Sequence, residues 1–206
     1  GKSTLVNLIP RFYDVTEGAV RIDGVDVRDM PKQELCARLG YVPQKSVLFS
    51  GTIDSNIRYG RTDASREEVE RAAQIAQAAE FIEEKDEKYD SSIAQGGSNV
   101  SGGQKQRLSI ARAIAKKPEI LIFDDSFSAL DYKTDVAVRR AIKQATGDTT
   151  TLIVAQRIST IIHADQIIVL DEGRVAGKGT HEELMKNCEV YQQIAKSQLS
   201  EEELAG

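Results

Sequence analysis

The chain has 206 residues, with 27 Lys and Arg against 32 Asp and Glu, so its formal net charge is −5. This length allows one large domain, or one domain that carries a smaller one, and the acidic balance argues against non-specific nucleic-acid binding as the main task. The composition, 40% hydrophobic and 29% charged, is typical of a globular domain rather than a disordered chain, and no apolar run approaches the ~20 residues of a membrane span.

The first elements that the sequence predicts are short. A helix over 5–9 ends at Pro10, and a strand over 18–23, a helix over 31–39 and a strand over 40–43 that ends at Gln44 follow it. The middle of the chain, residues 54–115, is helical in character. Residues 65–68 form a capping box before one helix, and a second helix over 102–116 ends before Pro118.

Strand character returns in the second half of the chain. Strands are predicted over 119–123, 149–155 and 166–170, and they alternate with helices over 134–145, 158–164 and 180–187. Strands that alternate with helices predict an α/β fold with a mainly parallel sheet covered on both faces. We therefore interpret residues 54–115 as a helical insertion into a sheet domain.

The chain opens on Gly1-Lys2-Ser3-Thr4, the last part of a phosphate-binding loop. Backbone N–H groups at a helix N-terminus bind phosphate oxygens, Lys2 would pair with the β- and γ-phosphates, and the Ser3 hydroxyl would bind Mg²⁺. The first glycine of such a loop and the strand before it are missing, so we expect the natural chain to begin upstream. Alone, the tetrapeptide is also compatible with a chance helix start.

A second segment supports the nucleotide site. Residues 120–123 form an apolar strand that ends in Asp124, and a carboxylate at this place suits the Mg²⁺ side of a phosphate loop. An apolar strand followed by Asp is common, but together with Gly-Lys-Ser-Thr it predicts a nucleotide-binding pair.

The most specific motif is Val100-Ser101-Gly102-Gly103-Gln104, which resembles the signature of the ATP-binding cassette (ABC) family with Val in its first place. Other segments resemble the same family in the same order, over residues 1 to about 195. Gln44 matches the Q-loop glutamine, and residues 128–131 match the D-loop. Residues 48–57 and 177–184 resemble exporters rather than importers.

The resemblance implies a P-loop NTPase with a RecA-like, mainly parallel core in two parts, 1–53 and 116–195. It also implies an inserted helical subdomain over 54–115, and an acidic tail is expected over 196–206. The implied cofactors are ATP and Mg²⁺, with the metal bound by Ser3, Gln44 and Asp124. The implied nucleotide-binding residues are Gly1, Lys2, Ser3, Thr4, Ser101, Gly102, Gly103, Gln104 and Asp131.

The implied partners are a second ABC subunit in a head-to-tail dimer and a transmembrane domain upstream in the same polypeptide, but no nucleic acid. The expected location is the cytoplasmic face of the cell membrane. In this family each ATP lies between the phosphate loop of one subunit and the signature of the other.

Two residues at the catalytic positions depart from the family pattern. Asp125 stands where the family places the Glu that polarises the attacking water, and its carboxylate reaches about 1.5 Å less far. Gln156 stands where the family places its switch histidine, and glutamine can donate a hydrogen bond but cannot become cationic. With Gln44, these are the candidate catalytic residues, and a small backbone shift that lets Asp125 still act is the alternative.

This pattern resembles the weakly hydrolysing subunit of a heterodimeric ABC exporter, because the signature stays nearly intact while both catalytic positions change. One alternative is a self-sufficient homodimeric export ATPase with Asp125 as the base. Another is a soluble, non-transport ABC-type regulatory ATPase, which the net charge of −5 and the exporter-like segments disfavour. The transported substrate stays open.

Overall fold

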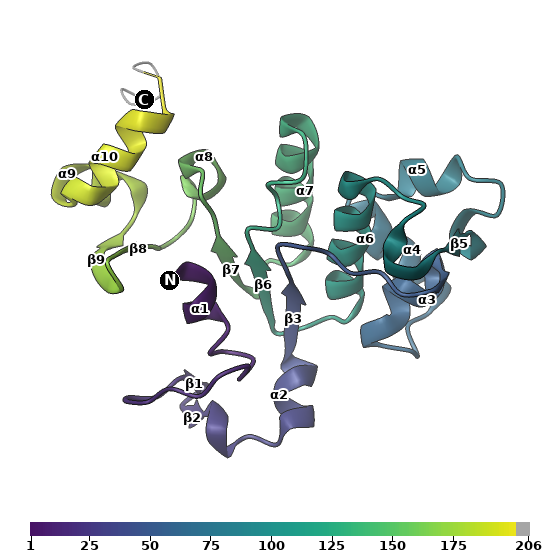
Figure 1. The fold of residues 1–206 in the computed structure, drawn as a ribbon, viewed down its shortest axis with the longest axis horizontal. Coiled ribbons are helices and arrows are strands. Elements are labelled where there is room, and N and C mark those ends of the chain that lie inside the picture. Colours follow the sequence, from purple (N-terminus) through teal and green to yellow (C-terminus); the bar gives the residue numbers. More distant parts are fainter. Residues whose placement is uncertain (201–206) are drawn as a thin grey trace.

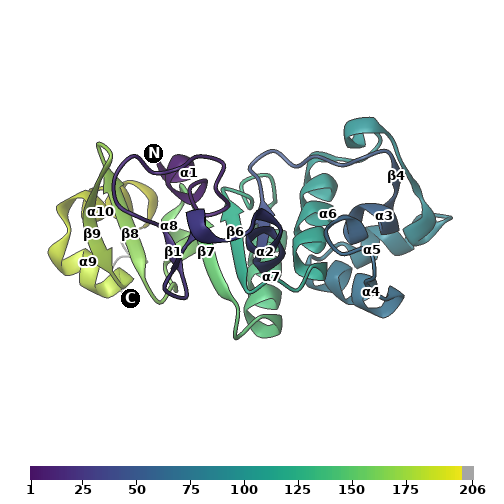
Figure 2. The ribbon, with the colours of Figure 1, turned by 90° about the horizontal axis from the view of Figure 1, so that it is seen from below.

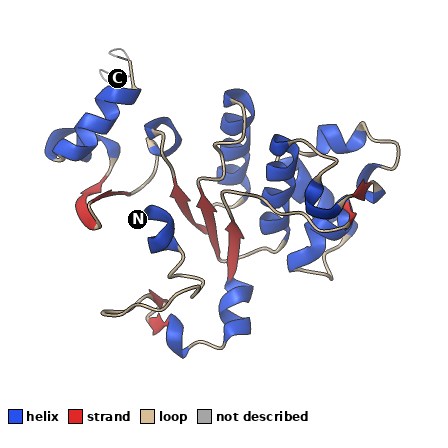
Figure 3. Cartoon of the chain, in the orientation of Figure 1, coloured by secondary structure: helices blue, strands red, loops and turns tan. Residues whose placement is uncertain are grey.

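A computed structural model describes residues 1–200 of the chain. Its centre is a parallel sheet of three strands in the order β3 (Leu39–Val42), β6 (Ile120–Asp124) and β7 (Thr150–Val154), seen as three aligned arrows in Figures 1 and 3. Tyr41 lies opposite Ile122, and Asp124 lies opposite Val154. The predicted parallel core is confirmed for these strands.

Alternate side chains of β6 face opposite sides of the sheet, as the two-residue strand period requires. On one face, Ile122 packs with Val154 and with Val6 of α1 (Lys2–Val6). On the other face, Phe123 lies in the large core that includes α6 (Gly102–Ala115) and α7 (Tyr132–Ala145). Both faces are thus covered, as predicted from the alternation of strands and helices.

The chain between β3 and β6 forms a mainly helical region on one side of the sheet, apparent in both Figure 1 and Figure 2. Ser65 caps α4 in a capping box with Glu68, as predicted, because each side chain accepts from the other residue's backbone N–H. The elements of this region before α6 are β4 (Gly51–Thr52), α3 (Ile53–Ile57), η2 (Arg58–Gly60), α4 (Arg66–Ile75), α5 (Ala79–Glu83), η3 (Lys88–Asp90), β5 (Ser92–Ile93) and η4 (Gln95–Gly97).

The segment between α1 and β3 forms a small hairpin and two short helices. These elements are β1 (Arg21–Ile22), β2 (Val25–Asp26), η1 (Val27–Asp29) and α2 (Lys32–Arg38). The predicted strand over 18–23 is therefore one arm of an antiparallel hairpin outside the central sheet.

The C-terminal part of the described chain lies at the opposite end from the helical region (Figure 2). Its elements are α8 (Ile158–Ile161), β8 (Ile167–Asp171), β9 (Arg174–Gly179), α9 (His181–Asn187) and α10 (Glu189–Gln198). The strand predicted over 166–170 exists as β8, but within residues 1–200 it pairs antiparallel with β9 and not with the parallel sheet.

Helix α10 continues to Gln198, beyond residue 196 where the acidic tail was predicted to begin. Residues 201–206, the rest of that predicted tail, lie outside the described residues. Among residues 1–200, no helix is both long and apolar enough to cross a membrane.

Candidate nucleotide site

Two predicted metal ligands meet at the carboxyl end of β6. The Ser3 hydroxyl of α1 donates to Asp124 Oδ1 over 2.8 Å, although 121 residues separate the two in sequence. The Asp124 side chain is buried, because it ends the central strand beneath α1. Lys2 is exposed at the start of the same helix, whose first N–H groups have no acceptor inside the helix.

Tyr41 is a residue of this site that sequence analysis missed. Its phenol oxygen lies 3.2 Å from Asp124 Oδ2 and 2.9 Å from Asn7 Oδ1. Burial, then the neighbouring Asp124 charge, raises the pKa of Tyr41 to about 12. The phenol therefore stays protonated near neutral pH and donates a hydrogen bond. The parallel register places Tyr41 next to the end of β6, and no local sequence pattern reports that register.

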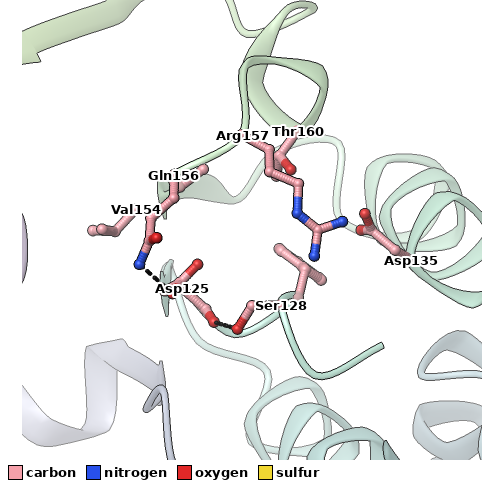
Figure 4. A pocket seen from close by; sticks show the side chains of 9 residues that line it. Asp125, Ser128, Asp135, Val154, Gln156, Arg157 and Thr160 are labelled. Atoms are coloured by element: carbon pink, nitrogen blue, oxygen red, sulfur yellow. Dashed lines mark hydrogen bonds between the residues drawn. The ribbon is translucent and has the colours of Figure 1, made fainter. Parts of the chain in front are cut away.

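The three candidate catalytic residues also meet. Asp125 Oδ2 accepts from Gln44 Nε2 at 3.2 Å and from Gln156 Nε2 at 3.0 Å. These side chains come from three separate loops, which follow β3, β6 and β7. Ser128 Oγ donates to the backbone oxygen of Asp125, and Figure 4 shows this bond beside the one from Gln156. The structure thus brings the side chains of Gln44, Asp125 and Gln156 together at one carboxylate oxygen.

The backbone of Asp125 is left-handed, with φ of 50°. Asp and Asn occupy this conformation more readily than most residues. Its N–H donates to the oxygen of Val154 at 2.9 Å, which fixes the carboxylate at the end of the sheet. The left-handed turn redirects the chain after β6, so that Asp125 faces a pocket while Asp124 is buried.

The pocket beside Asp125 is lined in part by Ser128, Asp135, Gln156, Arg157 and Thr160 (Figure 4). Arg157 is the cation next to Gln156 in sequence, and in Figure 4 its side chain extends toward Asp135. Within residues 1–200, Asp125 forms no ion pair with Lys, Arg or His. The donors that contact its carboxylate are therefore neutral amides.

The signature segment begins α6. Ser101 Oγ accepts from the N–H of Gln104 at 3.1 Å, and Gln104 Oε1 accepts from the N–H of Ser101 at 3.1 Å. This capping box leaves the hydroxyl hydrogen of Ser101 free to be donated elsewhere. A Cβ on Gly102 would meet nothing within 4 Å, so this side of the helix start is open.

Asp131 is the N-cap of α7. Its carboxylate accepts from the N–H of Thr134 at 2.9 Å and from Thr134 Oγ1 at 2.7 Å. These two hydrogen bonds lower the pKa of Asp131. Both carboxylate oxygens thus contact the helix that Asp131 begins, and its predicted role in nucleotide binding stays a prediction. Likewise, no hydrogen bond among residues 1–200 joins the 101–104 segment to Ser3, Asp124 or Asp125.

The donor set fits a nucleotide-bound Mg²⁺ better than a metal held by protein alone. Ser3 and Asp124 supply one hydroxyl and one buried carboxylate, both hard oxygen ligands. Within residues 1–200, no group of three or more His, Cys, Asp or Glu side chains is placed to bind a metal ion. Mg²⁺ commonly uses one or two protein oxygens and completes its coordination with phosphates and water. Gln44, the third predicted metal ligand, instead contacts Asp125.

Comparison with known proteins identifies relatives of this chain. The sequence model of the family described as ABC transporter matches residues 1–128. An uncharacterised ABC transporter ATP-binding protein of Mycobacterium tuberculosis is 48% identical over 201 residues, which are 96% of this chain and 34% of that protein. A putative multidrug export ATP-binding/permease protein of Staphylococcus aureus is 46% identical over 194 residues, or 94% and 34% of the two chains.

A solved structure gives the same result in three dimensions. The structure of a bacterial Atm1-family ABC exporter with ATP bound superposes with a TM-score of 0.93 at 44% identity. The match covers 98% of this chain and 35% of that chain. The chain thus spans about a third of the length of the relatives that it matches.

Proposed function

Since this chain belongs to the ABC transporter family, we propose that it is the ATP-binding part of an exporter, one that binds MgATP and hydrolyses it slowly at its own site. The family and the α/β P-loop fold, both predicted from sequence, are confirmed by the family match and by the likeness to the exporter structure. The slow hydrolysis is the new element of the proposal.

The observation that carries the proposal is the surroundings of Asp125. A general base must present a free lone pair to the attacking water, and two amides already donate to Asp125 Oδ2, which leaves Oδ1 as the carboxylate oxygen for that task. Its short side chain places the carboxylate close to the backbone, and neither Gln44 nor Gln156 can supply positive charge. Each of these features lowers the capacity of this site for hydrolysis.

The binding residues have separate roles in this proposal. Lys2 and the first N–H groups of α1 bind the β- and γ-phosphates, and Ser3 and Asp124 hold Mg²⁺. The chemistry that Mg²⁺ supplies when bound is neutralisation of charge on those phosphate oxygens. Gly1 and Thr4 complete the phosphate loop.

The signature acts on a second nucleotide. In a head-to-tail dimer, the free hydroxyl hydrogen of Ser101 and the open side of Gly102 would face the ATP held by the partner subunit, beside Gly103, Gln104 and Asp131. Such a chain would support hydrolysis in its partner while its own site mainly binds. We therefore propose a heterodimer in which the partner carries the catalytic Glu.

The proposal extends to the whole protein. Residues 1–53 and 116–195 form one nucleotide-binding core, and residues 54–115 form a helical subdomain that carries the signature. A membrane domain in the same polypeptide would place this core at the cytoplasmic face of the membrane. The Staphylococcus aureus relative is named a putative multidrug export protein, which supports export as the transport direction.

The experiment is a comparison of steady-state ATPase rates in the full-length chain purified with its partner. Asp125→Ala is expected to change the rate of the complex by no more than about twofold, whereas a loss of two or more decades is the scale expected for a true base. The matched control is replacement of the partner's catalytic Glu by Gln, which should abolish turnover. A full-length chain that turns over alone and loses activity in Asp125→Asn would instead establish the homodimeric alternative.

A further inference from the structure

One side chain far from the nucleotide site contacts the loop that carries Gln156. Gln198, the last residue of α10, donates from Nε2 to the backbone oxygen of Gln156 at 2.7 Å. Its Oε1 accepts from the backbone N–H of Ile158 at 2.8 Å. A single amide thus pairs with the backbone on both sides of Arg157, and we call these two bonds the Gln198 contact.

The Gln198 contact is anchored by an apolar core. Ile158 of α8 lies in a buried cluster with Tyr191 and Ala195 of α10, and Leu199 packs against the same cluster. Ala195 is three residues before Gln198, so both lie on the helix face that meets α8. The cluster therefore holds the last turn of α10 against α8, and its two hydrogen bonds fix the exposed Gln198 amide.

The opposite side of α8 is held by α7. Arg139 pairs with buried Asp135 at 2.7 Å and donates to the backbone oxygens of Ser159 and Thr160 at 3.5 and 3.4 Å. With Arg139 on one side and Gln198 on the other, the backbone from 156 to 160 has side-chain partners from two separate helices. The loop that presents Gln156 to Asp125 is thus restrained along its length.

We infer that Gln198 is a positioning residue for Gln156. By binding the Gln156 backbone oxygen, it fixes the direction in which that side chain leaves the loop, toward Asp125 Oδ2 at 3.0 Å. This inference rests on the proposed function and adds to it that the Gln156 amide, which donates to Asp125 here, donates to the γ-phosphate of bound ATP. Because ADP lacks that phosphate, Gln198 contributes to the preference of this site for ATP over ADP.

The test measures nucleotide affinity of the full-length chain in complex with its partner. The partner's own phosphate-loop lysine is replaced, so that only this site binds. The probes are a non-hydrolysable ATP analogue and ADP, each with Mg²⁺. Loss of one oriented hydrogen bond predicts that Gln198→Met weakens binding of the ATP analogue about threefold to tenfold. The affinity for ADP should stay within about twofold of wild type.

Two further variants separate positioning from general damage to the fold. Gln198→Glu keeps the acceptor for the Ile158 N–H but loses the donor to Gln156, so it should reduce ATP affinity as Gln198→Met does. If Gln198→Met does not fold, Gln198→Glu decides the question. Gln193→Met, on the exposed side of the same helix, is the matched control and should change the affinity for neither nucleotide.

The double variant Gln156→Ala/Gln198→Met is the decisive comparison, because residues that act through one another are non-additive. It should bind the ATP analogue no more weakly than Gln156→Ala alone. Equal losses for ATP and ADP, or additive losses in the double variant, would overturn the inference. If Gln156→Ala shifts ATP affinity and the Gln198 variants do not, only the positioning role fails. If Gln156→Ala also has no effect, the γ-phosphate role proposed for Gln156 fails with it.

Discussion

Asp124 and Asp125 are adjacent in sequence and lie in opposite surroundings. Asp124 ends β6, is buried, and contacts hydroxyl groups of Ser3 and Tyr41. Asp125 follows in a left-handed turn, lines a pocket, and contacts two loop glutamines. The sheet and α1 fix the first carboxylate, whereas loops fix the second. Under the proposed function, the sheet and α1 hold the carboxylate that would bind Mg²⁺, and loops hold the carboxylate that would act in hydrolysis.

The largest expected effect is a gain of hydrolysis in the double variant Asp125→Glu/Gln156→His. Glu extends the carboxylate by one carbon, and His removes the Gln156 amide and can supply a cation next to the γ-phosphate. A restored general base predicts a rise of about two orders of magnitude in hydrolysis at this site. Single-turnover ATP cleavage measures it, in a complex whose partner has its catalytic Glu replaced by Gln.

Asp125→Asn/Gln156→His is the control for this gain. Asn keeps the tolerance of Asp for the left-handed backbone but has no basic carboxylate. If this control gains as much as the Glu variant, the base is not residue 125. An unchanged rate in the Glu/His variant would show that the contrast between the two carboxylates does not limit hydrolysis.

A smaller effect is expected at the carboxylate that binds. Asp124→Asn removes the charge that Ser3 and Tyr41 orient, and loss of a charged hydrogen-bonding partner predicts about tenfold to hundredfold weaker binding of ATP in the presence of Mg²⁺. Chelation of Mg²⁺ should weaken wild-type binding and leave the variant little changed. The measurement is nucleotide titration of the full-length chain, with and without chelator.

Asp125→Asn is the matched control one residue away. It should leave Mg²⁺-dependent binding within about twofold, a change too small for loss of a charged hydrogen-bonding partner. Equal losses in both variants would mean that the two carboxylates share the metal, and the division into a binding half and a hydrolysing half would then be wrong.

The smallest effect is expected for Tyr41→Phe, which removes the phenol hydroxyl beside Asp124. Loss of one neutral donor predicts about 1 kcal/mol less local stability, measured as roughly fivefold faster hydrogen exchange in peptides that cover β6. Because the folded pKa of Tyr41 is raised to about 12, the phenol contributes stability that is fully present below its ordinary pKa near 10. That contribution is lost as the pH rises through 12.

Wild type should therefore lose stability between about pH 10 and pH 12 relative to Tyr41→Phe. Alkaline exchange rates of the two proteins, compared at matched pH, test the sign. Unchanged exchange at β6 in the Phe variant would show that Ser3 alone orients Asp124.

Local sequence patterns predicted much of this structure. Contacts between residues far apart in sequence were not predicted. The capping box at Ser65 forms as expected, because its residues lie within one turn. Strand β9 was missed because Gly177, Lys178 and Gly179 within it are poor strand formers. Helix α10 was missed as an element, and with it the contact that Gln198 makes 42 residues away.

The candidate site shows the same contrast between local features, which the sequence predicts, and long-range contacts, which it does not. The identity of Gln44, Asp125 and Gln156 was available from motif order, but their convergence on one carboxylate oxygen depends on three loops meeting in space. Tyr41 had no motif at all. Its proximity to Asp124 depends on the parallel register of β3 and β6, which hydrophobic patterning does not determine.

Helix α7 carries a further consequence. It begins at the Asp131 cap, and eight residues later, about 12 Å along the axis, Arg139 binds the backbone after Gln156. If residues 128–131 contact the partner subunit in the proposed dimer, α7 would connect that contact to α8 without any change in fold. Closure of the dimer and orientation of Gln156 would then share one coupling free energy. By thermodynamic reciprocity, a nucleotide that orders Gln156 would strengthen subunit contact by the same factor.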